Sequence, residues 1–443
     1  MECIPVTAAS IERRVREQLN NKVSGIYVGL WLLVAEHLRL GTWDLLKTWS
    51  EKSETDIDSR ISMQIIHESA LCVNRVRRKN SVCHQGFDLL NGLPFLVTDE
   101  QVHLLLNKHS VSVTKQLQIN LGKLRMANGH YNGNIIALDP HRIPTFSQRV
   151  MAKKKKKTKE SAKKYLQTFF SLDAETGQPI CFTMGSPGVS ATKATKELSE
   201  MELQILPKSK KNILFLADTE HFTAELFNHF EKNSAFEILV PAPNTEKLKT
   251  LLKKISYKRK WAGYAIAQTD YFFEGIPKKY TLIVQRSGEK RENYQYKAFL
   301  TTGNPELSVK MLTEHYPKRW TIEDFFNFEG NLGWNRASTM NINIRYGKAS
   351  LALIAQAVVS QLKAKLPCPY NQWTASHIAE QIFKAFDGDI KVKDDTIIVT
   401  LYNVPENLNL RYHYENLPQK LIRDGIDPRV PWLYNFKIDF RFK

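Results

Sequence analysis

Cysteine is scarce in this chain and follows no pattern. The five cysteines, at positions 3, 72, 83, 181 and 368, are odd in number and include no Cys-x-x-Cys pair. A disulfide framework and a thiolate zinc site both need more regular spacing, so neither is expected. Such cysteine usage fits a reducing cytoplasm.

Long apolar segments are also missing. Residues 25–35 form an apolar run, but it is too short to span a bilayer and is followed at once by Glu36-His37-Leu38-Arg39. No basic leader precedes it, as a signal peptide would require. We therefore predict a buried helix here and no membrane partner. No internal repeat is evident either.

Acidic residues are too few to balance the basic ones. Lysine and arginine number 63 against 45 aspartates and glutamates, which gives a formal net charge of +18 and a pI near 9.5. This surplus is typical of proteins with a polyanionic partner, most often nucleic acid, although a basic protein without such a partner has the same composition. The hydrophobic content of 42% predicts a folded chain, and 443 residues allow two to four domains.

Residues 1–130 have helical patterns and are predicted to form a DNA-binding region. Two of the helices, over residues 98–107 and 112–125, are separated by a short turn, and Thr98 with Gln101 forms a capping-box pattern. The second helix is polar and basic at its end. The pair is compatible with a helix-turn-helix that reads DNA, but any helical hairpin has a similar pattern.

The pattern changes after residue 130. Three strands are followed by helix, strand, helix and strand, over residues 134–138, 168–172, 179–184, 191–206, 212–217, 222–230 and 236–240. An antiparallel start followed by alternating helices and strands is the ribonuclease-H-like arrangement, so we predict an α/β fold with this core. Its first part covers residues 131–240 and its second part residues 313–365. A β-rich insertion separates the two at residues 241–312, and an α+β tail follows at residues 366–443.

Three carboxylates occupy distinctive places in this pattern. Asp139 ends the first strand, Asp218 ends the fourth, and Glu323 lies on a late helix. The first and fourth strands are neighbours in this topology, so the two aspartates are expected within reach of one another. Crowded carboxylates repel unless divalent cations join them, and two such ions can promote phosphodiester chemistry. Each acid alone has a plainer interpretation, as a turn residue, a helix-cap residue or half of a surface salt bridge.

The segment that ends in Glu323 is the most informative in the chain. Read as one helix, it places Tyr316, Arg319 and Glu323 at i, i+3 and i+7, so that all three project from one face. A phenol, a guanidinium and an acid on a helix held by its apolar side suit a site that handles phosphates and metal ions.

Three segments, IIALDPHRIP, ILFLADTEHF and YPKRWTIEDFF, resemble the acidic motifs of DDE transposases from bacterial cut-and-paste insertion sequences. That family has a ribonuclease-H-like core and a Tyr-x-x-Arg-x-x-x-Glu signature, which Tyr316, Arg319 and Glu323 match. The lysine that normally follows seven residues after the glutamate is replaced by Gly330. The resemblance extends over residues 130–365.

The resemblance implies that Asp139, Asp218 and Glu323 are catalytic and bind two Mg²⁺ ions, with Mn²⁺ as the alternative metal. It also implies that Arg319 contacts a DNA phosphate near the cleaved end and that Tyr316 contacts the same strand.

Further DNA contacts are expected on less specific grounds. Arg336 or Lys348 would replace the missing lysine. Trp261, in the insertion, would stack a flipped base, although packing in a core is the commoner role of a tryptophan. Three residues begin a lysine-rich stretch that either contacts the DNA backbone or forms a solvated loop: Lys153, Lys154 and Lys155.

We therefore expect a metal-dependent DNA transposase that cleaves insertion-sequence ends and joins their 3′-OH to target DNA. Its partners would be inverted-repeat ends and target DNA, bound by a homodimer that assembles on DNA at the nucleoid of a bacterial cytoplasm. One alternative is a related nuclease or resolvase that does not join strands. Another is a transposase-derived DNA-binding protein without catalysis, which the departure at Gly330 favours and the intact acid triad opposes.

Overall fold

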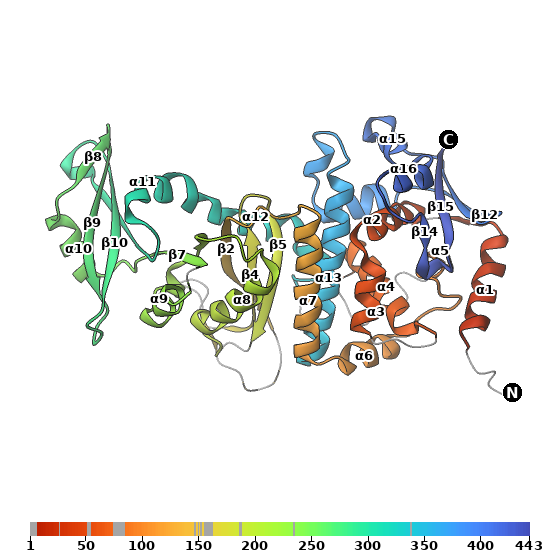
Figure 1. Ribbon diagram of the computed structural model, residues 1–443, viewed down its shortest axis with the longest axis horizontal. Helices are drawn as coiled ribbons and strands as arrows, with labels where there is room; N and C mark the ends of the chain where they lie inside the picture. Colours follow the sequence, from red (N-terminus) through yellow and green to blue (C-terminus); the bar gives the residue numbers. More distant parts are fainter. Residues whose placement is uncertain are drawn as a thin grey trace. The chain divides into compact units, whose positions relative to one another are not determined.

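The computed structural model describes residues 7–25, 27–50, 55–73, 85–145, 148, 150, 153–154, 163–185, 188–233, 235–336 and 339–443. The chain forms two compact units. One comprises Met1–Asn128 together with Phe326–Lys443, and the other comprises Gly129–Phe325. Their elements are labelled in Figure 1, and each unit is described by itself.

The second unit is built on a mixed sheet. Its first five strands run in the order β5-β4-β2-β6-β7. β4 pairs antiparallel with β2 and β5, whereas β2, β6 and β7 are parallel. Their bounds are Ile135–Pro144 (β2), Lys163–Asp173 (β4), Gln178–Gly185 (β5), Ile213–Leu216 (β6) and Phe236–Pro241 (β7). This is the strand order of the ribonuclease-H-like arrangement, so the expected α/β core is confirmed.

Two helices pack on this sheet. α8 (Ala191–Ile205) contacts β4 and β5, and α9 (Ala224–Glu231) contacts β7 (Figure 1). Each begins at a hydroxyl cap, since the side chains of Ser190 and Thr223 accept backbone N–H bonds from the first turn. All four residues of β6 are buried, as expected for a central parallel strand covered on both faces.

The insertion extends the same sheet. β11 pairs with β7, and the antiparallel order continues through β10, β9 and β8. The strands are Lys258–Trp261 (β8), Tyr264–Phe272 (β9), Lys279–Ser287 (β10) and Gln295–Thr301 (β11). One helix, α10 (Glu246–Lys254), precedes them. The expected β-rich character of this segment is therefore confirmed.

The segment that leads to Glu323 is not one uniform α-helix. A short α-turn (Ser308–Lys310, α11) passes into a π-turn over Met311–His315 and then into a 3₁₀ turn over Tyr316–Trp320. α12 begins at Thr321 and ends at Glu329. Pro317 sits at the start of the 3₁₀ turn, where its missing N–H costs no internal helical bond.

The first unit is organised around α13 (Ile342–Lys363). This helix is buried along most of its length and contacts α2, α4, α6 and α7, as the blue and orange helices of Figure 1 show for α13 and α7. The other helices of this unit include Ala8–Asn20 (α1), Leu33–Leu40 (α2), Thr42–Trp49 (α3), Ile57–Ala70 (α4), Gln85–Leu90 (α5), Asp99–Lys108 (α6), Val111–Ala127 (α7) and Ala375–Ile378 (α14). The expected helical pair corresponds to α6 and α7, and the capping box of Thr98 and Gln101 is present.

A second sheet completes the first unit. Its order is β1-β12-β13-β15-β14, from Val23–Gly25 (β1), Gly388–Lys393 (β12), Thr396–Leu401 (β13), Arg429–Val430 (β14) and Phe436–Phe442 (β15). Helices α15 (Leu410–Tyr414) and α16 (Leu417–Arg423) lie against β15. In the part of the chain that the structure describes, no helix is both long and apolar enough to cross a membrane.

Candidate active site

Asp139 lies on β2 and Asp218 follows the neighbouring strand β6, the adjacency that the sequence predicted. β2 and β6 are parallel, and their register pairs Ala137 with Leu216, two residues before each aspartate. The negative charge of Asp218 helps to raise the pKa of Asp139. The two carboxylates therefore converge at the same edge of the sheet.

The strand that carries Asp139 does not end there. β2 continues to Pro144 and stays paired with β4, where Asp139 is opposite Phe170. The expectation that Asp139 terminates its strand is wrong, because Pro140 lies within this antiparallel pairing without ending it. Burial, and then the charge of Asp218, raise the pKa of Asp139 to about 7.

Asp218 is held by the turn that follows β6. Its Oδ1 accepts a hydrogen bond from the backbone N–H of Glu220 at 3.1 Å and lies 2.7 Å from Nδ1 of His221. Burial opposes ionisation of Asp218, but the hydrogen bond and charge of His221 outweigh it, so its pKa is lowered. His221 was not singled out from the sequence, although its position three residues after Asp218 in a capped turn was the available signal.

Arg319 joins Glu323 to Asp139. Its Nη2 donates to Oε1 of Glu323 at 2.8 Å, and its Nη1 lies 3.5 Å from Oδ1 of Asp139. The Arg319 side chain is only 11% exposed. Glu323 and Asp139, which lies 180 residues before Arg319 in the chain, thus meet on one cation.

Tyr316 lies beside this group. Its ring packs on Phe299 with centroids 4.7 Å apart, and Nζ of Lys297 lies 5.2 Å from the Tyr316 ring centroid. Both partners come from β11 of the insertion. The insertion therefore contributes side chains to the neighbourhood of the acids, a role that the sequence did not reveal for Lys297.

A pocket of about 610 Å³ adjoins the acids. Asp218, Tyr316 and Arg319 line one part of it, and α10 and β11 line another. Three lysines face it: Lys249, Lys253 and Lys297. Burial and the charge of Arg319 lower the pKa of Lys297. The spacing of Lys249 and Lys253, one turn apart on a capped helix, was a sequence signal for a basic face.

The donor set suits a divalent cation. Carboxylate oxygens are the ligands that Mg²⁺ and Mn²⁺ prefer, and Asp139 lies within the electrostatic reach of both Asp218 and Glu323. The raised pKa of Asp139 reflects acids crowded in a site of low solvation, which a cation would relieve. Within the described residues no three His, Cys, Asp or Glu side chains are grouped closely enough to hold a metal, and Arg319 bridges two of the acids.

The remaining expected contacts are spread more widely. Trp261 is 48% exposed and stacks on Tyr264 with ring centroids 4.3 Å apart. The alternative that this tryptophan packs in a core is therefore wrong. It does not line the pocket beside the acids. Lys153 and Lys154 form a short strand, β3, paired with residues 163–164, while Lys155 lies outside the described residues.

Arg336, Lys348 and Gly330 belong to the other unit. Arg336 is exposed, whereas burial lowers the pKa of Lys348 to about 8. Gly330 is buried, and a Cβ added there would lie 2.5 Å from Oδ1 of Asn335. A side chain at this position would therefore have to shift the end of the Asn335 side chain, which is itself exposed.

Comparison with known proteins agrees with this geometry. The model of a family described as "Transposase DDE domain" matches residues 130–356. Among solved structures, the chain matches the cryo-EM structure of piggyBac transposase in a synaptic complex with hairpin DNA, with 11% identity, coverage of 82% of this chain and 81% of that chain, and a TM-score of 0.42. No curated protein matches the sequence. Since the family match spans more than half of the chain, this protein belongs to the DDE transposases.

Proposed function

We propose that this transposase cleaves the ends of an insertion sequence and joins their 3′-OH to target DNA by in-line phosphoryl transfer. The observation that carries the proposal is the meeting of Asp139 and Glu323 on Arg319, with Asp218 just after the adjacent strand. In this proposal the three acids are catalytic. A nuclease could use the same acids, so strand joining must be tested separately.

The three carboxylates would hold two Mg²⁺ ions, or Mn²⁺. When bound, these ions would supply Lewis-acid stabilisation of the attacking and leaving oxygens. Asp218 is oriented for this role because His221 and the N–H of Glu220 fix its Oδ1.

Arg319 would then exchange its carboxylate partners for a DNA phosphate. With its two carboxylates engaged by cations, its planar donors would be free to bind a phosphate of the cleaved strand. Tyr316 packs beside it, and Lys297 approaches the same pocket from the insertion. We propose that Lys297, and not Arg336 or Lys348, provides the contact that the family's missing lysine would make.

The other DNA contacts would come from more exposed groups. Trp261, stacked on Tyr264 at the edge of the insertion, would present its outer face to an unpaired base. Lys153, Lys154 and Lys155 would contact the backbone without sequence preference. The helical pair α6 and α7 would read the terminal repeat. We further propose that a homodimer forms on DNA at the bacterial nucleoid, because two ends must be brought together before joining.

Isosteric variants test the catalytic assignment. Asp139→Asn, Asp218→Asn and Glu323→Gln should each abolish cleavage of a terminal-repeat duplex while binding to that duplex persists. Asp324→Asn, an exposed acid next to Glu323, is the matched control and should cleave normally. Full cleavage by all three isosteric variants would refute the assignment. A plasmid target in the same reaction separates a transposase, which joins the cut end, from a nuclease, which does not.

A further inference from the structure

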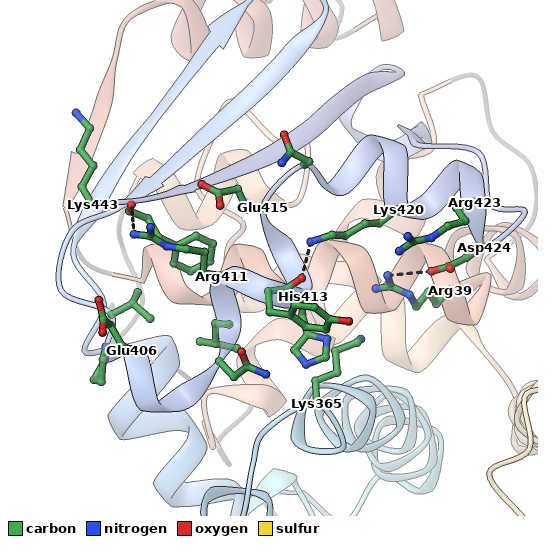
Figure 2. A pocket seen from close by; sticks show the side chains of 17 residues that line it. Arg39, Lys365, Glu406, Arg411, His413, Glu415, Lys420, Arg423, Asp424 and Lys443 are labelled. Carbon is green, nitrogen blue, oxygen red and sulfur yellow. Dashed lines mark hydrogen bonds and ion pairs between the residues drawn. The ribbon is translucent and has the colours of Figure 1, made fainter.

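A second pocket lies in the unit that contains the C-terminus, outside the residues that the family model matches. Its volume is about 800 Å³, and it is lined by Arg39 of α2, by Lys365 after α13, and by residues between 404 and 443 (Figure 2). Neither the acids of the transposase site nor the insertion contributes to it. Its function is therefore not covered by the catalytic proposal.

The lining is unusually basic. Six lysines and arginines face the pocket, against three carboxylates. Figure 2 shows Arg39, Lys365, His413, Lys420 and Arg423 gathered along one wall. A concave surface with surplus positive charge favours an anionic ligand, because the field of the several cations adds within it.

Two of these cations, Arg39 and Lys365, are held in place by the buried acid Glu36. Glu36 is fully buried and accepts hydrogen bonds from Arg39 at 3.3 Å, from the hydroxyl of Tyr414 at 2.6 Å and from Lys365. Arg39 also contacts Asp424 at 3.5 Å. The Glu36 carboxylate thus orients both cationic heads, and Asp424 adds a second, partly exposed acid beside Arg39.

Two further cations of the lining, Lys420 and Arg423, form no ion pair among the residues that the structure describes. Lys420 donates to the backbone carbonyl of Tyr412, and the charges of Glu415 and Asp439 act on it from nearby. Arg423 is exposed. Burial lowers the pKa of both Lys365 and Lys420, against the charge of Glu36 at Lys365 and of Glu415 at Lys420. An anion in the pocket would stabilise the charged form of both lysines.

We propose that this pocket binds a phosphate group, with Arg423 and Lys420 as its direct ligands and Arg39 and Lys365 as the preset wall behind them. Arginine offers a planar pair of donors to phosphate oxygens, and lysine adds a point charge. The phosphate could belong to the backbone of DNA or to a free phosphate ester, and the chemistry of recognition is the same for both.

Footprinting of lysines by an amine-acylating reagent tests the proposal site by site. Acylation of Lys420 in the full-length protein is measured by mass spectrometry under four conditions. These are the protein without ligand, with a duplex of random sequence, with ATP, and with inorganic phosphate. Protection by the duplex alone identifies backbone phosphate as the ligand. Protection by ATP or inorganic phosphate as well identifies a free phosphate ester. Equal acylation of Lys420 under all four conditions overturns the proposal.

A charge-matched pair of variants provides the second arm. Lys420→Ala with Arg423→Ala removes two positive charges from the pocket, and Lys391→Ala with Arg441→Ala removes two exposed charges elsewhere in the same unit. If the ligand that protects is DNA, the pocket pair should weaken duplex binding by about 10-fold and reduce the slope of log K against log salt by about 2. If the ligand is a free ester, the pocket pair should abolish protection of Lys365 by ATP. Equal effects of the two pairs would contradict the proposal, whatever the result for strand cleavage.

Discussion

Arg319 and Glu323 are joined by a 2.8 Å hydrogen bond across the junction between a 3₁₀ turn and an α-helix. Their spacing of four residues would allow such a pair on any exposed helix, where it contributes little. Here the Arg319 side chain is 11% exposed and also reaches Asp139, a residue of the central sheet. The pair is therefore part of a three-residue arrangement and not a surface salt bridge.

Two substitutions of Arg319 should separate the effect of its positive charge from the effect of its planar pair of donors. We expect Arg319→Ala to lower the rate of DNA cleavage by about 100-fold, since a preorganised donor to the reacting phosphate is lost. Arg319→Lys keeps the charge but loses the planar pair of donors, so it should recover only part of the rate. Single-turnover cleavage of an end-labelled duplex measures both. Wild-type rates for Arg319→Ala would remove this residue from the site.

Lys297 should contribute to binding of the cleaved strand. Lys297→Ala is expected to weaken binding of terminal DNA about 3- to 10-fold and to reduce the salt slope by about 1, as for one lost phosphate contact. Lys260→Ala, an exposed lysine on β8 of the same insertion, is the control. Fluorescence anisotropy at several salt concentrations gives the slope. If the two variants have the same slope, Lys297 makes no special contact.

The sequence predicted the core well because its patterns are local. Strand β6 is a short, fully apolar run followed by an acid, and α8 begins at a serine cap, so both appear directly in the order of residues. The adjacency of Asp139 and Asp218 followed from the strand order alone. Such features depend on periodicity and topology, which one chain already contains.

The rest of the site depends on contacts between distant segments. Nothing near Lys297 in the sequence indicates that β11 pairs with β7 and so brings this lysine beside Tyr316. Likewise, the proline after Asp139 suggested a turn, but pairing with β4 keeps the strand extended. Tertiary pairing overrode the local preference in both cases.

Position 330 should tolerate a small side chain at a modest cost. Gly330→Ala places a Cβ against the end of the exposed Asn335 side chain, which can turn toward solvent, so we expect a loss of about 1 kcal/mol or less in the free energy of unfolding. In Gly330→Ala combined with Asn335→Ala the obstacle is gone, and the combined loss should be smaller than the sum of the two single losses. Chemical denaturation of all four proteins measures this. Strict additivity would show that Asn335 is not the obstacle.

Glu202 should make stability fall as the pH rises. This residue of α8 is fully buried, and burial raises its pKa to about 8 from the ordinary value of 4.5. Between these values the unfolded chain releases the proton and the folded chain keeps it, so the unfolded state binds fewer protons and stability decreases with increasing pH.

The neutral variant Glu202→Gln has no such proton to lose. It should match the wild type near pH 5 and exceed it near pH 8 by roughly 3–4 kcal/mol. Glu200→Gln, an exposed acid on the same helix, should leave the pH dependence unchanged. Chemical denaturation at the two pH values measures the stability of each protein. The same pH dependence of stability for Glu202→Gln and wild type would contradict the prediction.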